Sequence, residues 1–99
     1  MTELKELNLR ETRVSDLTPL TDLRALRVLD LIGTQVTDLT PLADLAALES
    51  LVLDGTPVTD LRPLKGLTSL EYLALSNTKV NAAQIKEIQA ALPNLEIAR

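Results

Sequence analysis

Two aspartates, Asp30 and Asp54, come closest to forming a chemical site in this sequence. Carboxylates are the ligands that hard cations prefer, and a pair of them can also serve as general acid and base. Little surrounds this pair, because the chain has no histidine and no cysteine, which excludes imidazole bases, thiolate nucleophiles and Cys/His zinc sites. Gly33 and Gly55 lack the spacing of a phosphate-binding loop. The sequence therefore predicts no enzyme, no metal and no cofactor, and an aspartate-based enzyme is the least favoured alternative.

The charge of the chain argues against two classes of partner. Ten Lys and Arg against fourteen Asp and Glu leave a net charge of −4, so nothing attracts a phosphate backbone or an anionic membrane. No uncharged run approaches the roughly 18 to 20 residues that cross a bilayer, and the first residues are too polar for a signal peptide. We expect a cytoplasmic protein without nucleic-acid or membrane partners, or an exported or surface-exposed one if the sequence is a fragment.

A 22-residue repeat runs along the whole chain and must position these residues. Leucine or isoleucine stands three and five positions after each repeat's first leucine, threonine eight positions after it and valine ten. The first leucines are Leu4, Leu26, Leu48, Leu70 and Leu92. Such a period predicts a solenoid, in which each repeat forms one coil and buries its leucines against the next coil.

Residues 31–42 resemble the 22-residue leucine-rich repeat of bacterial internalin-like proteins, whose repeats carry a similar Asp-Leu/Ile-x-Pro-Leu segment. The resemblance covers residues 4 to 97 and implies an α/β leucine-rich-repeat solenoid of about four and a half coils, forming a single domain over residues 1–99. Its repeats would begin near residues 4, 26, 48 and 70, with a partial repeat from 92. That family usually has asparagine where this chain has Thr12, Thr34, Thr56 and Thr78. A hydroxyl offers one donor where an amide offers two.

The spacing within a repeat predicts its local structure. Alternation in Leu29-Asp30-Leu31 indicates a strand with leucines inward, so that the strands form a parallel concave sheet. Leu39, Leu42 and Leu45 then recur at every third residue, which is typical of a short 3₁₀ turn on the convex side. Pro41 suits the start of that turn, and Thr37 or Asp38 can cap it, as can Ser15 or Asp16 and Thr59 or Asp60 in the neighbouring repeats.

The two ends of the repeat array differ. Residues 82–92 predict a true α-helix with Ile85 and Ile88 on its buried stripe, capped by Asn81 with Gln84 in a capping box and stopped by Pro93. A last strand with Leu95 and Ile97 follows. At the other end only Met1, Thr2 and Glu3 precede Leu4, so we expect the first coil to present an open strand edge.

Outward strand positions supply the predicted binding surface. The 22-residue register places Asn94, Glu96 and Ala98 in the same three columns as Tyr72, Ala74 and Ser76. Apolar side chains gather in the middle of these columns, and together with the two aspartates they form the candidate partner-binding set. That set is Tyr72, Val52, Val28, Ile32, Ala74, Asp30 and Asp54. Val, Ile and Tyr also simply suit strands, which is the alternative explanation of the apolar strip.

The leading hypothesis is a non-catalytic module that binds a protein or an extended peptide through this concave face. Its area is under about 400 Å², whereas a standard interface buries about 800 Å² on each partner. The alternative is a structural or self-assembling repeat unit, either a fragment of a longer receptor or a designed scaffold, that forms a homodimer through the open N-terminal edge.

Overall fold

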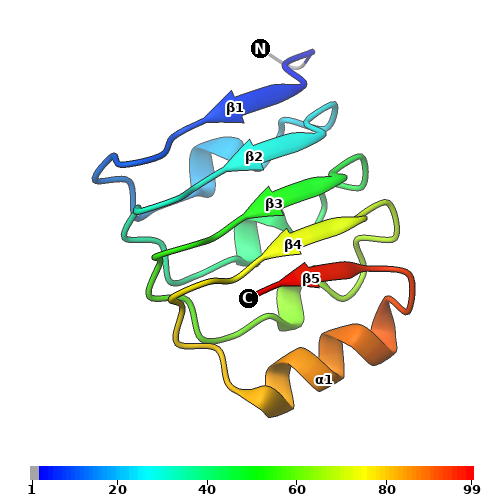
Figure 1. Ribbon diagram of the computed structural model, residues 1–99. Coiled ribbons are helices and arrows are strands. Elements are labelled where there is room, and N and C mark those ends of the chain that lie inside the picture. Colours follow the sequence, from blue (N-terminus) through cyan, green and yellow to red (C-terminus); the bar gives the residue numbers. More distant parts are fainter. Residues whose placement is uncertain (1–2) are drawn as a thin grey trace.

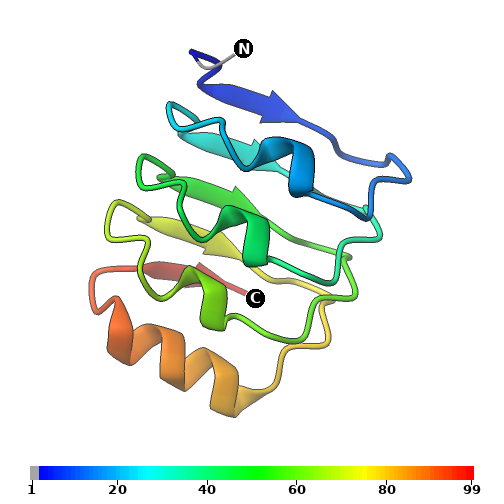
Figure 2. The same ribbon diagram turned by 180° about the vertical axis from the view of Figure 1, so that it is seen from behind.

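The computed structural model describes residues 3–99. They form a stack of coils whose strands make one parallel sheet in the order β1-β2-β3-β4-β5 (Figure 1). Met1 and Thr2, which the sequence places ahead of the first coil, lie outside the described residues. The strands are β1 (Glu6–Asn8), β2 (Val28–Asp30), β3 (Ser50–Val52), β4 (Tyr72–Ala74) and β5 (Glu96–Ala98). Behind the sheet lie the 3₁₀ turns η1 (Thr18–Leu20), η2 (Thr40–Leu42) and η3 (Arg62–Leu64), followed by helix α1 (Ala82–Ala91) (Figure 2). The predicted leucine-rich-repeat solenoid is confirmed.

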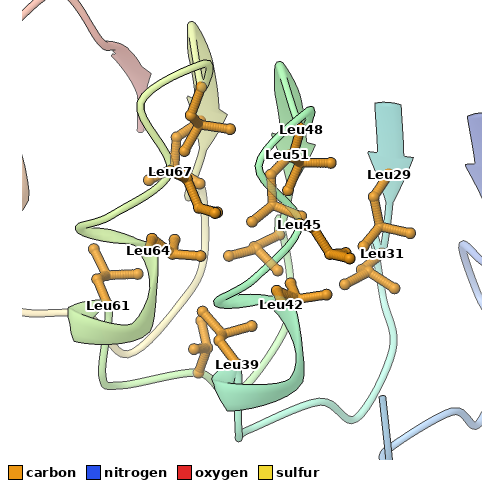
Figure 3. Close-up of a cluster of buried hydrophobic side chains, with 14 of the residues drawn as sticks. Leu29, Leu31, Leu39, Leu42, Leu45, Leu48, Leu51, Leu61, Leu64 and Leu67 are labelled. Carbon is orange, nitrogen blue, oxygen red and sulfur yellow. The ribbon is translucent and has the colours of Figure 1, made fainter. Parts of the chain in front are cut away.

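Leucines from the sheet and from the 3₁₀ turns fill the space between these two layers (Figure 3). Leu29, Leu31 and Leu51 on the strand side and Leu42 and Leu64 on the turn side are all 0% exposed. Each coil has room for only one row of such side chains, so its leucines are covered by the coils before and after it. Burial therefore depends on stacking rather than on any one coil.

Backbone hydrogen bonds join each coil to the next beyond the short strands. Leu9 N–H donates to Asp30 O at 2.8 Å, Leu31 N–H to Val52 O at 2.9 Å and Leu53 N–H to Ala74 O at 2.9 Å. The first four coils each have one residue with positive φ at the same point after the strand: Glu11, Gly33, Gly55 and Asn77. Gly33 has φ +71°, a backbone conformation that side chains rarely adopt, which favours glycine there; the Glu11 carboxylate that a Cβ would meet at 2.6 Å is the end of an exposed side chain and can move aside.

The threonine column closes the turn that follows each strand. Thr34 and Thr56 are 2% and 1% exposed, and each hydroxyl donates to the carbonyl three residues earlier, at 2.8 Å. Thr12 and Thr78 make the same bond at 2.6 and 2.9 Å. One hydroxyl thus bonds one carbonyl within its own coil, as the single donor of a threonine allows.

An aspartate column bonds the first amide of each 3₁₀ turn, as predicted; the acceptor is the aspartate, one position before the N-cap leucine, and not the Ser or Thr before it. Oδ1 of Asp16, Asp38 and Asp60 accepts the backbone N–H two residues later, at 2.9 to 3.0 Å. A side-chain hydrogen bond from Thr18, Thr40 or Arg62, respectively, is the main cause that lowers the pKa of each aspartate, and the backbone bond adds to it.

These lowered pKa values predict that the aspartate column favours the folded state above the ordinary aspartate pKa. That contribution is lost as the pH falls through the lower folded pKa, because the folded carboxylates must then be protonated. Asp38→Asn keeps an oxygen that accepts from Thr40 N–H but removes the charge. We expect its free energy of unfolding, measured with urea, to fall less than that of the wild type between neutral pH and about pH 3. Asp44→Asn, at an exposed aspartate outside the column, is the control, and equal acid sensitivity of Asp38→Asn and the wild type would contradict the prediction.

Helix α1 closes the C-terminal end of the core and changes the repeat length. Asn81 Oδ1 accepts from Gln84 N–H at 2.9 Å, which confirms the cap. The Gln84 side chain, however, accepts from Leu61 N–H at 2.9 Å and so bonds the preceding coil instead of completing a capping box. In β5, which follows the helix, Glu96 pairs with Tyr72 of β4 and Ala98 pairs with Ala74. The last coil is therefore two residues longer than the 22-residue register, and the predicted columns of Asn94, Glu96 and Ala98 are wrong by one column.

Within residues 3–99, β1 is paired on one side only, with β2. Leu4, Leu7, Leu9 and Val14 are only partly buried, whereas Leu26, Leu29, Leu31 and Val36, their counterparts one repeat later, are all 0% exposed. The difference arises because the structure describes no strand or turn on the outer side of β1 (Figure 1).

Candidate functional site

Outward side chains of the sheet form two columns that the strand pairing defines. The first runs Glu6, Val28, Ser50, Tyr72, Glu96, and the second runs Asn8, Asp30, Val52, Ala74, Ala98. Beyond the strands, the ladder continues through Glu11 N–H to Ile32 O and Gly33 N–H to Asp54 O, at 2.7 and 2.9 Å. Ile32 and Asp54 thereby extend the face by a third column.

Val52 is the centre of the apolar part of this concave face. Val28 and Ile32 on the coil before it and Tyr72 on the coil after it each stand one column away, and all four side chains are partly exposed. Ser50 separates Val28 from Tyr72 within the first column. These four apolar residues, which we call the apolar cross, therefore lie diagonally about Val52.

Ala74 belongs to this face by register but contributes almost nothing to its surface. It is only 3% exposed, because its one-carbon side chain stands between Val52 and Ala98. The expectation that Ala74 offers an exposed contact is therefore wrong, while its small size leaves space beside Val52 and Tyr72.

The two aspartates bond the backbone and stand in different columns. Asp30 Oδ1 accepts from Ile32 N–H at 3.1 Å, and its Oδ2 lies 3.6 Å from Arg10 Nε. Asp54 Oδ1 accepts from Ser76 N–H at 2.9 Å, which joins the third coil to the fourth. The depression at Asp30 is lined by Glu6, Leu7, Asn8 and Val28 and does not reach Asp54. Within residues 3–99 no cluster of three acidic, His or Cys side chains suits a metal ion.

Beside the first column lies an acidic rim of Glu49, Glu71 and Glu96, which the sequence analysis did not identify. A surface hollow is lined by Glu49, Glu71, Glu96 and Asn94 with residues 68–70, next to Tyr72. Arg27 donates two bonds to Glu49, from Nε at 3.0 Å and from an Nη at 3.1 Å, so Glu49 is neutralised by the preceding coil. The sequence does contain a signal for this acidic rim, in the residue just before each strand. Lys5 and Arg27 precede the first two strands, whereas Glu49 and Glu71 precede the next two. Glu96 joins them only because of the longer last coil.

No helix within residues 3–99 combines the length and the apolar character needed to span a bilayer.

Comparison with known proteins supports the repeat assignment. The family described as "Leucine Rich repeats (2 copies)" matches residues 2–44. Internalin C2 from Listeria monocytogenes is 36% identical with a TM-score of 0.88, over 97% of this chain and 41% of that one. The chain thus spans about two fifths of the length of that internalin. A search of curated proteins found no match.

Two less similar structures show the same fold. The Drosophila melanogaster SNF/U2A' complex contains a chain that is 22% identical with a TM-score of 0.72, over 97% of this chain and 60% of that one. A chain of the TLR13–ssRNA13 complex is 24% identical with a TM-score of 0.81, over 98% of this chain and 15% of that one.

The repeat period, the parallel sheet with its 3₁₀ turns, the family match and the likeness to internalin C2 agree. This chain belongs to the leucine-rich-repeat proteins, with repeats of the internalin-like 22-residue type.

Proposed function

We propose that this chain is a non-catalytic interaction module that binds a protein or an extended peptide on its concave face. The observation that carries the proposal is the partly exposed apolar cross of Val28, Ile32, Val52 and Tyr72 on an otherwise polar surface. Tyrosine is among the residues that most often anchor an interface, and exposed apolar side chains that gather on one face mark an interaction surface. The fold commonly serves protein binding, as in the SNF/U2A' complex.

The acidic rim indicates the chemistry of such a partner. Glu71 and Glu96 lie beside Tyr72, in the hollow that borders the first column. A peptide with an apolar side chain placed over Val52 would bring its next residues to these carboxylates. We therefore favour an apolar anchor flanked by lysine or arginine, and the net charge of −4 favours a basic partner as well.

Tyr72→Glu combined with Val52→Glu tests this proposal. The partner is not identified, so the probe is a set of peptides selected from a displayed random library on the wild-type chain. We expect the double variant to bind these peptides at least about a hundredfold more weakly, because two carboxylates replace the central apolar contacts.

Thr37→Glu combined with Thr59→Glu is the matched control, since it adds the same charge at two exposed positions in the turns that follow the strands. Circular dichroism establishes that both variants are folded. Peptides that bind the Tyr72 and Val52 variant as tightly as the control variant would show that the concave face is not the site.

A second candidate function is self-assembly through the N-terminal edge. The specific observation in its favour is the incomplete burial of Leu4, Leu7, Leu9 and Val14, when every repeat equivalent in the second coil is fully buried. A strand edge with exposed core leucines beside it favours association with another strand. Sedimentation of the wild-type chain over a wide concentration range tests this candidate, and a strictly monomeric chain would exclude it.

A further inference from the structure

We propose that the hollow beside Tyr72 takes an arginine side chain of a bound peptide, with the guanidinium held between the carboxylates of Glu71 and Glu96. The inference rests on the proposed function, binding of a peptide on the concave face, and adds which side chain the peptide presents and where that side chain lies. The ligand is thus an extended peptide that carries an arginine close to its apolar anchor.

The hollow collects hydrogen-bond acceptors from neighbouring coils. Glu71 comes directly before β4, and Glu96 of β5 pairs with Tyr72, so the two glutamates lie on adjacent strands, whose backbones are about 4.8 Å apart. Thr68 and Asn94 line the same hollow, and their side chains carry further oxygens. A cation that enters the hollow therefore meets two carboxylates and other acceptors beside them.

The chain does not balance the charge of this hollow. Within residues 3–99 the ion pairs engage neither Glu71 nor Glu96. Glu49, the third carboxylate of the acidic rim, is paired with Arg27. A basic side chain from a partner would therefore meet two carboxylates without an ion-pair partner, and charge complementarity favours it over a neutral or acidic side chain.

The chain itself shows how the acidic rim binds a guanidinium. Arg27 donates to the two carboxylate oxygens of Glu49, from Nε at 3.0 Å and from an Nη at 3.1 Å, which is the two-bond geometry that matches arginine to a carboxylate. This hydrogen bonding is the main cause that raises the pKa of Arg27, and the charge of Glu71 is among the smaller contributions. The neighbour of Glu71 in this row is Glu49, so the chain supplies no arginine there and a ligand can.

A guanidinium suits this arrangement better than an ammonium. It carries five donors in a planar fork, so it can bond carboxylates on two coils at once, whereas lysine offers three donors on a compact point charge. A guanidinium is also more weakly hydrated than an ammonium, so it leaves water at a lower cost. We therefore expect the hollow to prefer arginine to lysine.

Tyr72 connects the hollow with the apolar cross. Along the chain it follows Glu71 of the hollow and precedes Ala74 of the second column, which pairs with Val52. The aliphatic stem of an arginine can pack along this aromatic side chain while its charged head lies in the hollow. Ala74 is small and only 3% exposed, so a peptide backbone can approach the sheet beside Val52. An arginine and a neighbouring apolar residue would then contact both Tyr72 and Val52.

The size of the concave face suits an extended peptide. The face offers under about 400 Å², whereas a standard interface between folded proteins buries about 800 Å² on each partner. An extended peptide can gain its specificity from a few side chains that fit separate pockets. One arginine in the hollow and one apolar anchor on the cross would supply two such contacts.

Glu71→Gln combined with Glu96→Gln tests the site, because glutamine keeps the size of each side chain and removes its charge. The probe is the set of peptides selected from the displayed library on the wild-type chain. We expect these peptides to carry an arginine near an apolar residue and to bind the double variant roughly tenfold to a hundredfold more weakly than the wild type. Replacing that arginine by lysine should weaken binding to the wild type, and replacing it by alanine should cost little further affinity on the double variant.

Glu3→Gln combined with Glu87→Gln is the matched control, since it removes the same charge from two exposed glutamates that do not line the hollow. This variant should bind the peptides nearly as tightly as the wild type. Circular dichroism establishes that both double variants are folded.

Arg27→Gln gives a test in the opposite direction. It releases Glu49, which also lines the hollow, so we expect the arginine peptides to bind this variant severalfold more tightly. Arg13→Gln removes the same charge at another exposed position and should have a smaller effect. A role of Arg27 in stability alone would not tighten binding.

The variants separate the possible outcomes. Peptides that bind the Glu71 and Glu96 variant as tightly as the control would overturn the arginine site, and the proposed function would stand if Tyr72→Glu with Val52→Glu still weakens their binding. Equal binding of arginine and lysine peptides would overturn the preference for arginine. Peptides that bind both double variants like the wild type, or a wild-type chain that selects no peptide, would overturn the arginine site and the proposed function together.

Discussion

Leu51→Ala should cost about 2–5 kcal/mol of the free energy of unfolding. Leu51 is 0% exposed in the middle strand, where it stands between Leu29 and Leu73 of the neighbouring strands, and it lies among the buried leucines of the core (Figure 3). Truncation leaves a cavity there, and the coils on both sides hold it open. Small domains are stable by only about 5–15 kcal/mol, so this one change should remove a large share of the total. Urea denaturation monitored by circular dichroism measures it.

Leu7→Ala, at the same position two coils earlier, is the matched control. Leu7 is only partly buried and lies at the open edge, so the truncated side chain leaves a surface groove in place of a closed cavity. We expect a cost on the order of 1 kcal/mol. Equal losses at the two positions would mean that leucines are not buried by their neighbouring coils. The comparison is made with dilute protein, where no association stabilises the edge.

Ile88→Asp should prevent stable folding. Ile88 is 1% exposed on the inner side of α1 and belongs to the leucine core. The substitution removes roughly 1.5–3 kcal/mol of apolar burial and adds a carboxylate whose burial without a partner costs several kcal/mol more. The sum is comparable to the whole stability of a small domain. The circular dichroism spectrum and the thermal transition of the purified variant are the measurements.

Ala90→Asp adds the same charge two residues later on the same helix, at an exposed position, and should remain folded. If both variants melt like the wild type, α1 does not close the core. If both are unfolded, added charge and not loss of the closing contact is the cause.

Much of the fold was predictable because a solenoid repeats its local rules. Alternating leucines gave the strands, leucines at every third residue gave the 3₁₀ turns, and Asn81 with Pro93 gave the limits of the helix. Each of these signals lies within a few residues of the structure it specifies.

The last coil could not be placed by the same counting. A helix rises only about 1.5 Å per residue, so it needs more residues than a 3₁₀ turn to cross the same distance. The coil through α1 is two residues longer in consequence, and Glu96 instead of Asn94 stands beside Tyr72. The Gln84 bond to Leu61 was equally inaccessible, because it joins residues 23 apart across two coils.

On the candidate face, too, part of the arrangement was predictable from the sequence and part was not. Its columns followed from the register of the middle coils, which place Val52 between Asp30 and Ala74. How much of each side chain reaches the surface depends on the sizes of its neighbours, so the burial of Ala74 needed the structure. The partner itself is the subject of the two proposals above.

Residue-resolved hydrogen exchange tests the stacking of coils most directly. The amides of Leu31 and Leu53 each donate to the next coil at 2.9 Å, and they stand 22 residues apart at the same position of their repeats. We predict slow exchange at both, with the same pattern of protected and unprotected amides recurring along the second and third coils. A pattern of protected amides that does not repeat every 22 residues, or rapid exchange at both amides in the folded chain, would contradict the solenoid.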